Sequence, residues 1–394
     1  MTTRAITNFR SYCNVGKAGE RGTAPKPLVI ADGRFVEEGQ PNNEASAAEH
    51  LDAAGRIFAP GLIDTHVHGG GSFDLMTDDP EQVRGYARWA ASRGVTGFLI
   101  STSGRDHTQI VHRLRALAPL IAEPGPGAAR VLGFHLEGPY INPVRKGAFD
   151  PRWLRAPSVA EYEELFEASG GAIRQMTLAP ELPCADELIG AVVASGAVAA
   201  MGHTDATYEQ AMRAIDLGVT HVTHCFNAMR PFSHRDPGVL GAVLTTDTVT
   251  AELIGDGAHV DYAAARVLIR AKGPGRIVLI TDGMPLAGTD DGEGEWEGVR
   301  IRVDGGKAVR VSDGTIIGGV ITLADAVQNA ARYMEVGAAE AIDMASVNAS
   351  AALKLRDGAG WQGKNADFIL LDDELRVTET WVAGERVWTA AGAA

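Results

Sequence analysis

The chain is poor in cysteine and has no long apolar run. Only three of its 394 residues are cysteines: Cys13, Cys184 and Cys225. They are odd in number, far apart and without CxxC spacing, which argues against a disulfide framework and for a reducing compartment. The first residues lack the apolar run of a signal peptide, and no stretch of about 18 apolar residues could span a membrane. We therefore expect a cytoplasmic protein with no membrane partner.

Positive charge is also scarce. The chain carries 36 Lys and Arg residues against 50 Asp and Glu residues, for a formal net charge of -14. A surface of this sign repels nucleic acid and anionic membranes, and we expect neither as a partner. An anionic small molecule can still bind if the site supplies a local basic pocket.

The length predicts a large domain and a smaller one, because 394 residues exceed the usual size of a single hydrophobic core. Residues 1–58 and 359–394 contain short strand-like runs broken by turns, and we expect the two ends to form one small β domain. Residues 59–358 alternate apolar runs with helical segments, which are clearest at 81–94, 207–218 and 261–273.

Eight strand-like apolar runs lie between residues 61 and 284. Strands that alternate with helices in this way predict an α/β protein with a (β/α)₈, or TIM, barrel. Their nearly continuous apolar character fits strands that are buried on both faces. The runs are GLIDTHVH, VTGFLIST, VLGFHLEGP, IRQMTLAPE, VAAMGHTDA, VTHVTHCFNAM, VTAELIGDGAHVD and RIVLITDGM.

Histidines and carboxylates fall at the ends of six of these runs. Such residues are costly to bury unpaired, so packing alone does not explain them. In TIM barrels the C-terminal ends of the strands form the active-site rim, where we expect these side chains to meet. They are His66 and His68, Glu137, His203, His224, His259, and Asp282.

The types of residue at this rim indicate a metal site. His66 and His68 form an HxH pair, whose side chains point the same way on a strand. Glu137, His203 and His224 would supply one carboxylate and two imidazoles, which leaves an open position as in catalytic zinc sites. Imidazole also suits iron and other borderline metals. The alternative for each residue is a hydrogen-bonded core histidine or a surface acid.

Three further residues suggest roles around such a metal. Asp282 can take a proton from water and return it to a leaving amine, although it could instead be a helix cap or a salt-bridge partner. Arg235 and His259 are candidate anion ligands, since a guanidinium matches a phosphate. The alternative for Arg235 is a solvated loop charge. We expect His221 and His135 to be supporting residues, His135 by orienting a ligand through its other ring nitrogen.

Eight motifs, in order, resemble the N-acetylglucosamine-6-phosphate deacetylases of the amidohydrolase superfamily. The motifs are PGLIDTHVHG, HLEGPY, TLAPE, GHTDAT, THCFNAM, DGAHVD, TDGM and GTIIGG, and the resemblance as a whole runs from about residue 30 to the C-terminus. The resemblance implies a distorted TIM barrel with a small β-sandwich built from both chain ends. It also implies hydrolysis of N-acetylglucosamine 6-phosphate to glucosamine 6-phosphate and acetate, in amino-sugar catabolism.

The same resemblance assigns residue roles. It implies that Glu137, His203 and His224 hold the main divalent metal, with zinc first and iron, cobalt, manganese or nickel as alternatives. Because both His66 and His68 are present, one or two ions per subunit are expected. Asp282 would act as general base and then acid. The sugar phosphate would contact Asn227, the Ala228 backbone, Arg235 and His259, with Arg235 reaching across the interface of a homodimer.

Two departures from the family pattern bear on the substrate. Phe149 stands where the family usually has a histidine that polarises the amide carbonyl, and Gly319 stands where a small hydroxyl residue is common. They leave open another N-acyl sugar, such as N-acetylgalactosamine 6-phosphate, or another small amide. A metal-free sugar-phosphate isomerase or lyase would need a Lys or Glu base at a strand end, and no Lys occupies one. A non-catalytic protein would be expected to have lost a ligand or Asp282.

Overall fold

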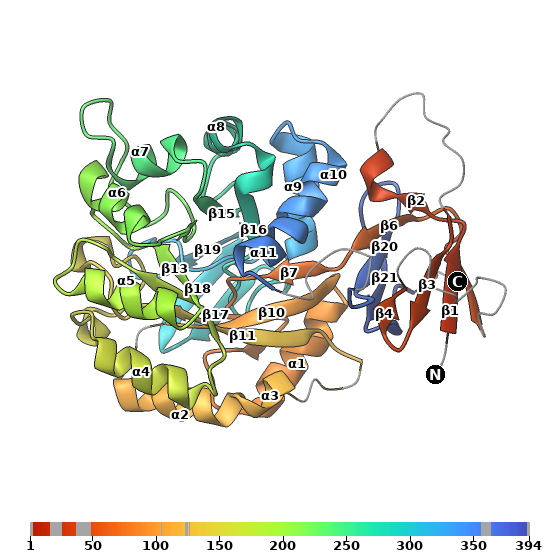
Figure 1. The fold of residues 1–394 in the computed structure, drawn as a ribbon, viewed down its shortest axis with the longest axis horizontal. Coiled ribbons are helices and arrows are strands. Elements are labelled where there is room, and N and C mark those ends of the chain that lie inside the picture. Colours follow the sequence, from red (N-terminus) through yellow and green to blue (C-terminus); the bar gives the residue numbers. More distant parts are fainter. Residues whose placement is uncertain are drawn as a thin grey trace.

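An eight-stranded parallel sheet forms the centre of the molecule (Figure 1). The computed structural model describes residues 3–15, 26–36, 49–103, 105–122, 125, 127–355 and 364–391. The strands, in spatial order, are β7 (Leu62–Asp64), β10 (Val95–Thr102), β11 (Arg130–Glu137), β12 (Ile173–Leu178), β13 (Val198–Met201), β14 (His221–Val222), β15 (Thr250–Ile254) and β16 (Ile277–Ile280). Each arises from one of the eight predicted runs, so the predicted barrel strands are confirmed.

The barrel closes where its first and last strands meet. Val67, just beyond β7, forms a parallel bridge with Gly283, just beyond β16. The Asp282 amide also donates to the His66 carbonyl at 2.9 Å. The two strands themselves form no ladder in the described sheet, which makes the barrel distorted, as expected. This seam joins the HxH segment directly to Asp282.

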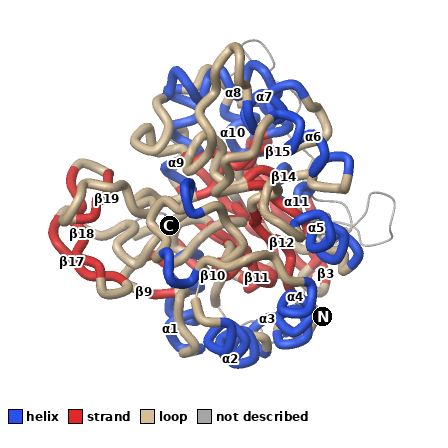
Figure 2. The backbone as a smooth tube through the Cα atoms, turned by 90° about the vertical axis from the view of Figure 1, so that its left-hand side faces the viewer, coloured by secondary structure: helices blue, strands red, loops and turns tan. Residues whose placement is uncertain are grey.

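Helices link the strands and cover the outside of the barrel (Figures 1 and 2). The predicted helices at 81–94, 207–218 and 261–273 are confirmed. The Asp79 side chain caps the first of them by accepting a hydrogen bond from the Glu81 amide, and Pro80 stands in its first turn. The helices are α1 (Pro80–Ala91), α2 (His107–Leu117), α3 (Pro119–Ala122), α4 (Val159–Ala168), α5 (Ala185–Ala194), α6 (Tyr208–Asp216), α7 (Gly238–Thr245), α8 (Tyr262–Lys272), α9 (Leu323–Tyr333), α10 (Ala338–Met344) and α11 (Val347–Ala352).

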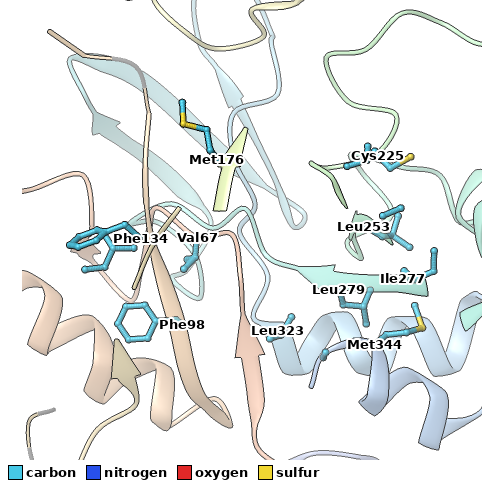
Figure 3. Close-up of a cluster of buried hydrophobic side chains, with 14 of the residues drawn as sticks. Val67, Phe98, Phe134, Met176, Cys225, Leu253, Ile277, Leu279, Leu323 and Met344 are labelled. Carbon is cyan, nitrogen blue, oxygen red and sulfur yellow. The ribbon is translucent and has the colours of Figure 1, made fainter. Parts of the chain in front are cut away.

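The main core lies between the strands and these helices. Figure 3 shows Phe98 and Phe134 from neighbouring strands beside Val67, and Leu279 beside Leu323 and Met344 from α9 and α10. All are at most 1% exposed. Burying a side chain of this size stabilises the fold by about 1.5–3 kcal/mol, so this cluster provides a rigid base for the strand ends.

Both ends of the chain build a small two-sheet β domain beside the barrel (Figure 1). One sheet contains β4 (Arg34–Phe35), β3 (Leu28–Ala31), β1 (Thr3–Thr7) and β5 (Glu49–Asp52); the other contains β2 (Arg10–Ser11), β6 (Ile57–Pro60), β20 (Phe368–Leu371), β21 (Val377–Val382) and β22 (Glu385–Thr389). Apolar side chains from both sheets, among them Ile6, Phe58 and Phe368, form a core of their own. The domain limits at 58/59 and 358/359 remain predictions; the second lies outside the described residues.

A further three-stranded sheet lies at one side of the barrel and was not predicted (Figure 2, left). It contains β17 (Gly292–Trp296), β18 (Val299–Asp304) and β19 (Lys307–Arg310), paired antiparallel. A two-stranded ribbon, β8 (Gly69–Gly70) with β9 (Phe73–Asp74), follows the HxH segment. Trp296, at the tip of the β17–β18 hairpin, donates from its indole to Asp74 at 3.3 Å. This hydrogen bond attaches the β17–β19 sheet to the rim of the barrel.

Two features expected from the composition concern the cysteines and the helices. Cys13, Cys184 and Cys225 are free thiols, in line with the expected lack of a disulfide framework. Within the described part of the chain, none of the helices combines the length and the apolar character that crossing a membrane requires.

Candidate metal centre and catalytic cavity

The rim residues reach one point because the chain turns sharply after several strands. His203 follows β13, His224 follows β14 and Asp282 follows β16. All three have left-handed backbones, with φ values of 48°, 28° and 46°. Non-glycine residues in this region each cost about 1–3 kcal/mol and cluster at functional sites. The packed barrel around these three residues therefore holds them in a locally strained backbone conformation.

Glu137, His203 and His224 form the first ligand group. Glu137 Oε1 lies 3.1 Å from His203 Nε2 and 3.0 Å from His224 Nε2, and the two Nε2 atoms are 3.0 Å apart. All three residues are buried. Three donor atoms converge on one position from β11, β13 and β14. They could hold a divalent ion at this point.

His66, His68 and Asp282 form the second ligand group. His66 Nε2 lies 3.3 Å from His68 Nε2, and Asp282 Oδ1 is 3.3 and 3.4 Å from these two nitrogens. Glu137 faces both groups, because its Oε2 is 3.2 Å from His68 Nε2 while its Oε1 contacts the first group. One carboxylate thus connects two adjacent sets of donors, each of which could hold an ion.

A buried polar layer supports these ligands from inside the barrel, where TIM barrels usually carry apolar side chains. At the mouth, in the loop after β11, the Arg145 carbonyl oxygen lies 2.9 Å from His203 Nδ1, which can fix the tautomer that leaves Nε2 free. Inside the barrel, the support comes from Glu252. Glu252 lies 3.0 Å from His66 Nδ1 and 3.1 Å from His221 Nε2. His221 is therefore a supporting residue, as expected.

The expectation for His135 needs correction. Its ring nitrogens face Ser101 Oγ at 3.0 Å and Thr177 Oγ1 at 2.8 Å, so it does not orient a ligand by a hydrogen bond. It contacts His66 instead through ring packing, with centroids 4.5 Å apart. Both hydroxyl groups lie in the barrel interior beside His135. A sequence pattern does not reveal which of the nearby groups a buried imidazole will hydrogen-bond.

The electrostatics of the two groups favour a cation. Burial alone would lower the pKa of His66, yet Glu137, Asp282 and Glu252 raise it well above its ordinary value. Burial would raise the pKa of Glu137, but His66 and the hydrogen bonds from His203 and His224 lower it well below the usual range. The pKa of Asp282 is also lowered, because His66 and His68 outweigh burial. The carboxylates are therefore ionised at neutral pH.

The donor set fits a divalent ion of the zinc or iron type. Imidazole nitrogen and carboxylate oxygen are the ligands such ions take in catalytic sites. Within the described residues, Glu137 and Asp282 form ion pairs with histidines, and these histidines must be neutral to bind a metal. A dication can replace the protons that otherwise balance this charge.

A cavity of about 670 Å³ opens onto both groups. Asn227, Ala228 and His259 line it. His259 Nδ1 lies 2.6 Å from Asp256 Oδ2, which leaves Nε2 for a ligand. Burial would lower the pKa of His259, but Asp256 raises it above the ordinary value. Arg235 is exposed on the loop after Met229 and is outside the lining of this cavity.

The two departures from the family pattern have clear structural settings. Phe149 lines the cavity and packs edge-on against the His203 ring, with centroids 4.8 Å apart. At Gly319, an added Cβ would lie 2.0 Å from the Thr281 carbonyl oxygen, a severe clash with backbone. The Gly319 amide donates to the Asp282 carbonyl at 2.7 Å, so this glycine allows close contact with the segment that carries Asp282.

Residues contributed by the β17–β18 hairpin and by β15 were not predicted from the sequence. Trp296 lines the cavity and lies over His68, with ring centroids 6.1 Å apart. Next to it, Glu297 forms an ion pair with Arg105 across the mouth. Glu252 could have been found, because a carboxylate in the middle of the apolar run TAELI is as unexpected as the histidines at strand ends.

Comparisons with known proteins now define the class. The Amidohydrolase family model matches residues 57–387, so the chain belongs to the amidohydrolase family. The N-acetylglucosamine-6-phosphate deacetylase of Lysinibacillus sphaericus is 34% identical over 356 residues, covering 90% of this chain and 91% of that protein. The N-acetylgalactosamine-6-phosphate deacetylase of Escherichia coli O157:H7 is 37% identical over 331 residues, covering 84% and 87%.

A solved structure agrees with these relatives. N-acetyl-D-glucosamine-6-phosphate deacetylase from Mycobacterium smegmatis, determined as a mutant in complex with N-acetyl-D-glucosamine-6-phosphate, superposes with a TM-score of 0.87. The two chains are 32% identical, and the match covers 98% of this chain and 99% of the other. The resemblance inferred from the eight motifs is therefore confirmed.

Proposed function

We propose that the chain is a metal-dependent hydrolase that converts N-acetylglucosamine 6-phosphate and water into glucosamine 6-phosphate and acetate. The observation that carries this proposal is the convergence of Glu137, His203 and His224 beside Asp282, at the base of a cavity large enough for a sugar phosphate. A phosphorylated sugar is kept inside the cell by its charge, so we place the enzyme in the cytoplasm.

We propose zinc as the first candidate for the ion, with iron, cobalt, manganese or nickel as alternatives. Glu137, His203 and His224 would hold the main ion, and His66, His68 and Asp282, with Glu137 shared, would hold a second. A divalent ion supplies Lewis acidity when bound, which polarises an amide carbonyl and lowers the pKa of a water.

Asp282 moves the proton in this mechanism. Its ionised carboxylate takes a proton from the attacking water as the new C–O bond forms at the amide carbon. It then delivers that proton to the amide nitrogen as the C–N bond breaks, which gives the free amine and acetic acid. The acid proton then passes to the amine, so the products leave as acetate and an ammonium group. The lowered pKa of Asp282 keeps it in the proton-accepting form before the reaction.

The remaining proposed contacts hold the sugar phosphate. Asn227, the Ala228 backbone and His259 line the cavity of the same chain. Arg235 is exposed and lies outside that cavity, and we propose that it reaches the cavity of the other subunit in a homodimer. A phosphate held far from the amide orients the reacting group, so its binding energy contributes to catalysis.

An acetate-release assay tests the substrate. N-acetylated glucosamine, galactosamine and mannosamine would each be compared with and without the 6-phosphate. N-acetylglucosamine 6-phosphate should have the highest kcat/KM, and each unphosphorylated sugar should be far slower. Equal rates on phosphorylated and unphosphorylated sugars would overturn the proposed phosphate contacts.

N-acetylgalactosamine 6-phosphate is the second candidate substrate. Phe149 leaves it open, because an apolar ring beside His203 stands where the family usually has a histidine. The N-acetylgalactosamine-6-phosphate deacetylase that is 37% identical to this chain supports the same alternative. A higher kcat/KM for the galacto sugar in the same assay would select this alternative and leave the reaction type unchanged.

A further inference from the structure

Glu252 is a buried carboxylate that the mechanism above does not use. It lies on β15, in the barrel interior below the ligands, and is fully buried. A buried carboxylate is costly unless its oxygens are hydrogen-bonded or paired with charge. Its position in a strand, away from the exposed rim, excludes direct contact with substrate in the cavity, and Glu252 is not part of the cavity lining.

Each oxygen of Glu252 faces two nitrogen donors. Oε2 lies 3.0 Å from His66 Nδ1 and accepts from the His224 amide at 3.1 Å. Oε1 accepts from Gln175 Nε2 at 2.8 Å and faces His221 Nε2 at 3.1 Å. The oxygen Oε2 therefore contacts one residue from each ligand group: the ring of His66 and the backbone of His224.

We propose that Glu252 is a positioning residue that fixes the position of the two ligand groups relative to each other and sets the tautomer of His66. A proton on His66 Nδ1 is stabilised by Glu252, which leaves the Nε2 lone pair directed at the second ligand group. The negative charge also increases the basicity of that imidazole. This inference rests on the proposed metal centre.

The contacts predict an unequal effect on the two groups. In the second group, Glu252 contacts the ring of a ligand directly. In the first group it contacts only the His224 backbone, which is held independently because the Cys225 amide donates to the Glu252 carbonyl at 2.9 Å in the β14–β15 pairing. Loss of the carboxylate should therefore weaken the ion at His66, His68 and Asp282 much more than the ion at Glu137, His203 and His224.

The test compares Glu252→Gln with the wild-type enzyme and with a control from the same buried layer. Glutamine keeps the shape but removes the charge and one of the two acceptor oxygens. Thr177→Val is the matched control, because the Thr177 hydroxyl contacts His135 and Thr223 but no proposed ligand. Each protein would be titrated with Zn²⁺ against a competing chelator, and Mn²⁺-loaded samples would be examined by EPR for coupling between adjacent ions.

Wild type and Thr177→Val should bind two Zn²⁺ ions per chain and give a coupled Mn²⁺ spectrum. Glu252→Gln should bind the second ion about 10–100-fold more weakly, as is typical for loss of such a partner, and give the spectrum of an isolated ion. A second-ion affinity within about twofold of wild type would overturn the inference. An equal loss of affinity in Thr177→Val would overturn it too, since any disturbance of the buried layer would then be enough to weaken binding of the second ion.

Other outcomes separate this inference from the proposed function. Wild-type protein with a single ion would overturn the role of Glu252 and leave the Glu137 centre standing, whereas wild-type protein that binds no ion would overturn both. If Glu252→Gln does not fold, Glu252→Asp replaces it: the charge stays but the carboxylate withdraws from His66. That variant should also bind the second ion at least tenfold more weakly, and wild-type affinity would contradict the inference.

Discussion

The barrel mouth and the small β domain use buried space in opposite ways. At the mouth, buried histidines and carboxylates face one another, and His203, His224 and Asp282 have strained left-handed backbones. In the small domain, Phe58 stacks on Phe368 with centroids 4.8 Å apart, and Phe368 stacks on Trp381 at 5.2 Å. The first region concentrates charge for chemistry, and the second gains stability from aromatic packing.

This difference shows where each kind of substitution should act. Charge and strain at the mouth are sustained by the packed barrel around them, so changes there should alter activity more than folding. The aromatic core of the small domain contributes no residue to the described cavity lining. Changes there should alter folding more than activity.

Asp282→Asn should have the largest effect on activity. The amide cannot accept the proton of the attacking water, so kcat should fall by about 10²–10⁴-fold, the usual contribution of a general base. The folded protein should keep its first ion and its thermal midpoint should change little. Steady-state kinetics, metal analysis and thermal unfolding of the same sample provide the check. Near-normal turnover would remove Asp282 from this role.

Phe368→Ala should have the largest effect on stability. The side chain is fully buried between Phe58 and Trp381, and truncation of such a residue costs about 3–5 kcal/mol in the free energy of unfolding. The midpoint of urea unfolding should fall, while the metal content and KM of the folded fraction should stay at wild-type values. A specific loss of metal without a loss of stability would mean that the two regions are coupled in a way the contacts do not indicate.

Much of the fold and of the barrel mouth could be predicted from the sequence. The apolar runs located all eight barrel strands, since parallel strands buried on both faces leave a clear apolar signal. Histidines and acids at the strand ends located the mouth, because the fold directs those ends to one rim. Glu137 and His203 are brought together for this reason although 66 residues separate them.

What the sequence did not predict depends on long-range packing. The β17–β18 hairpin has an alternating pattern, but nothing in it indicates that Trp296 would contact Asp74 and cover His68. Ring packing on His66, rather than a hydrogen bond to a ligand, decides the role of His135. The distance of Arg235 from its own cavity also follows only from how its loop projects.

Arg235→Ala should have an intermediate effect that depends on the substrate. Loss of a charged hydrogen bond to phosphate costs about 1.5–3 kcal/mol, so KM for N-acetylglucosamine 6-phosphate should rise about 10–150-fold with little change in kcat. KM for unphosphorylated N-acetylglucosamine should not change. Arg230→Ala is a control for nearby charge, since Arg230 is paired with Asp236 on the same loop. An equal change on both substrates would show that Arg235 does not bind the phosphate.

Mixed subunits sharpen the same prediction. If Arg235 acts across a dimer, combining Arg235→Ala with Asp282→Asn subunits should restore one site with both residues intact. At a substrate concentration well below the KM of Arg235→Ala, both parent proteins are weakly active, so recovered activity in their mixture would support a shared site. Absence of recovery in a demonstrated mixed dimer would contradict it.

The smallest predicted effect is a pH dependence due to His259. Asp256 raises the pKa of His259 above the ordinary value of 6.5, so the charged form contributes to phosphate binding at low pH and is lost as the pH rises through the raised pKa. KM for the phosphorylated substrate should increase by up to about tenfold across that range. His259→Gln should have a higher KM at low pH and no such increase. The same pH dependence in His259→Gln would assign it to another group.

An anomalous-scattering measurement on crystals of the metal-loaded protein tests the central claim most directly. Data collected at the absorption edge of the bound metal should give a peak about 2.0–2.2 Å from Glu137 Oε1, His203 Nε2 and His224 Nε2, within the usual bonding range. A metal peak elsewhere in the molecule, with none among these three atoms in fully active protein, would contradict the account.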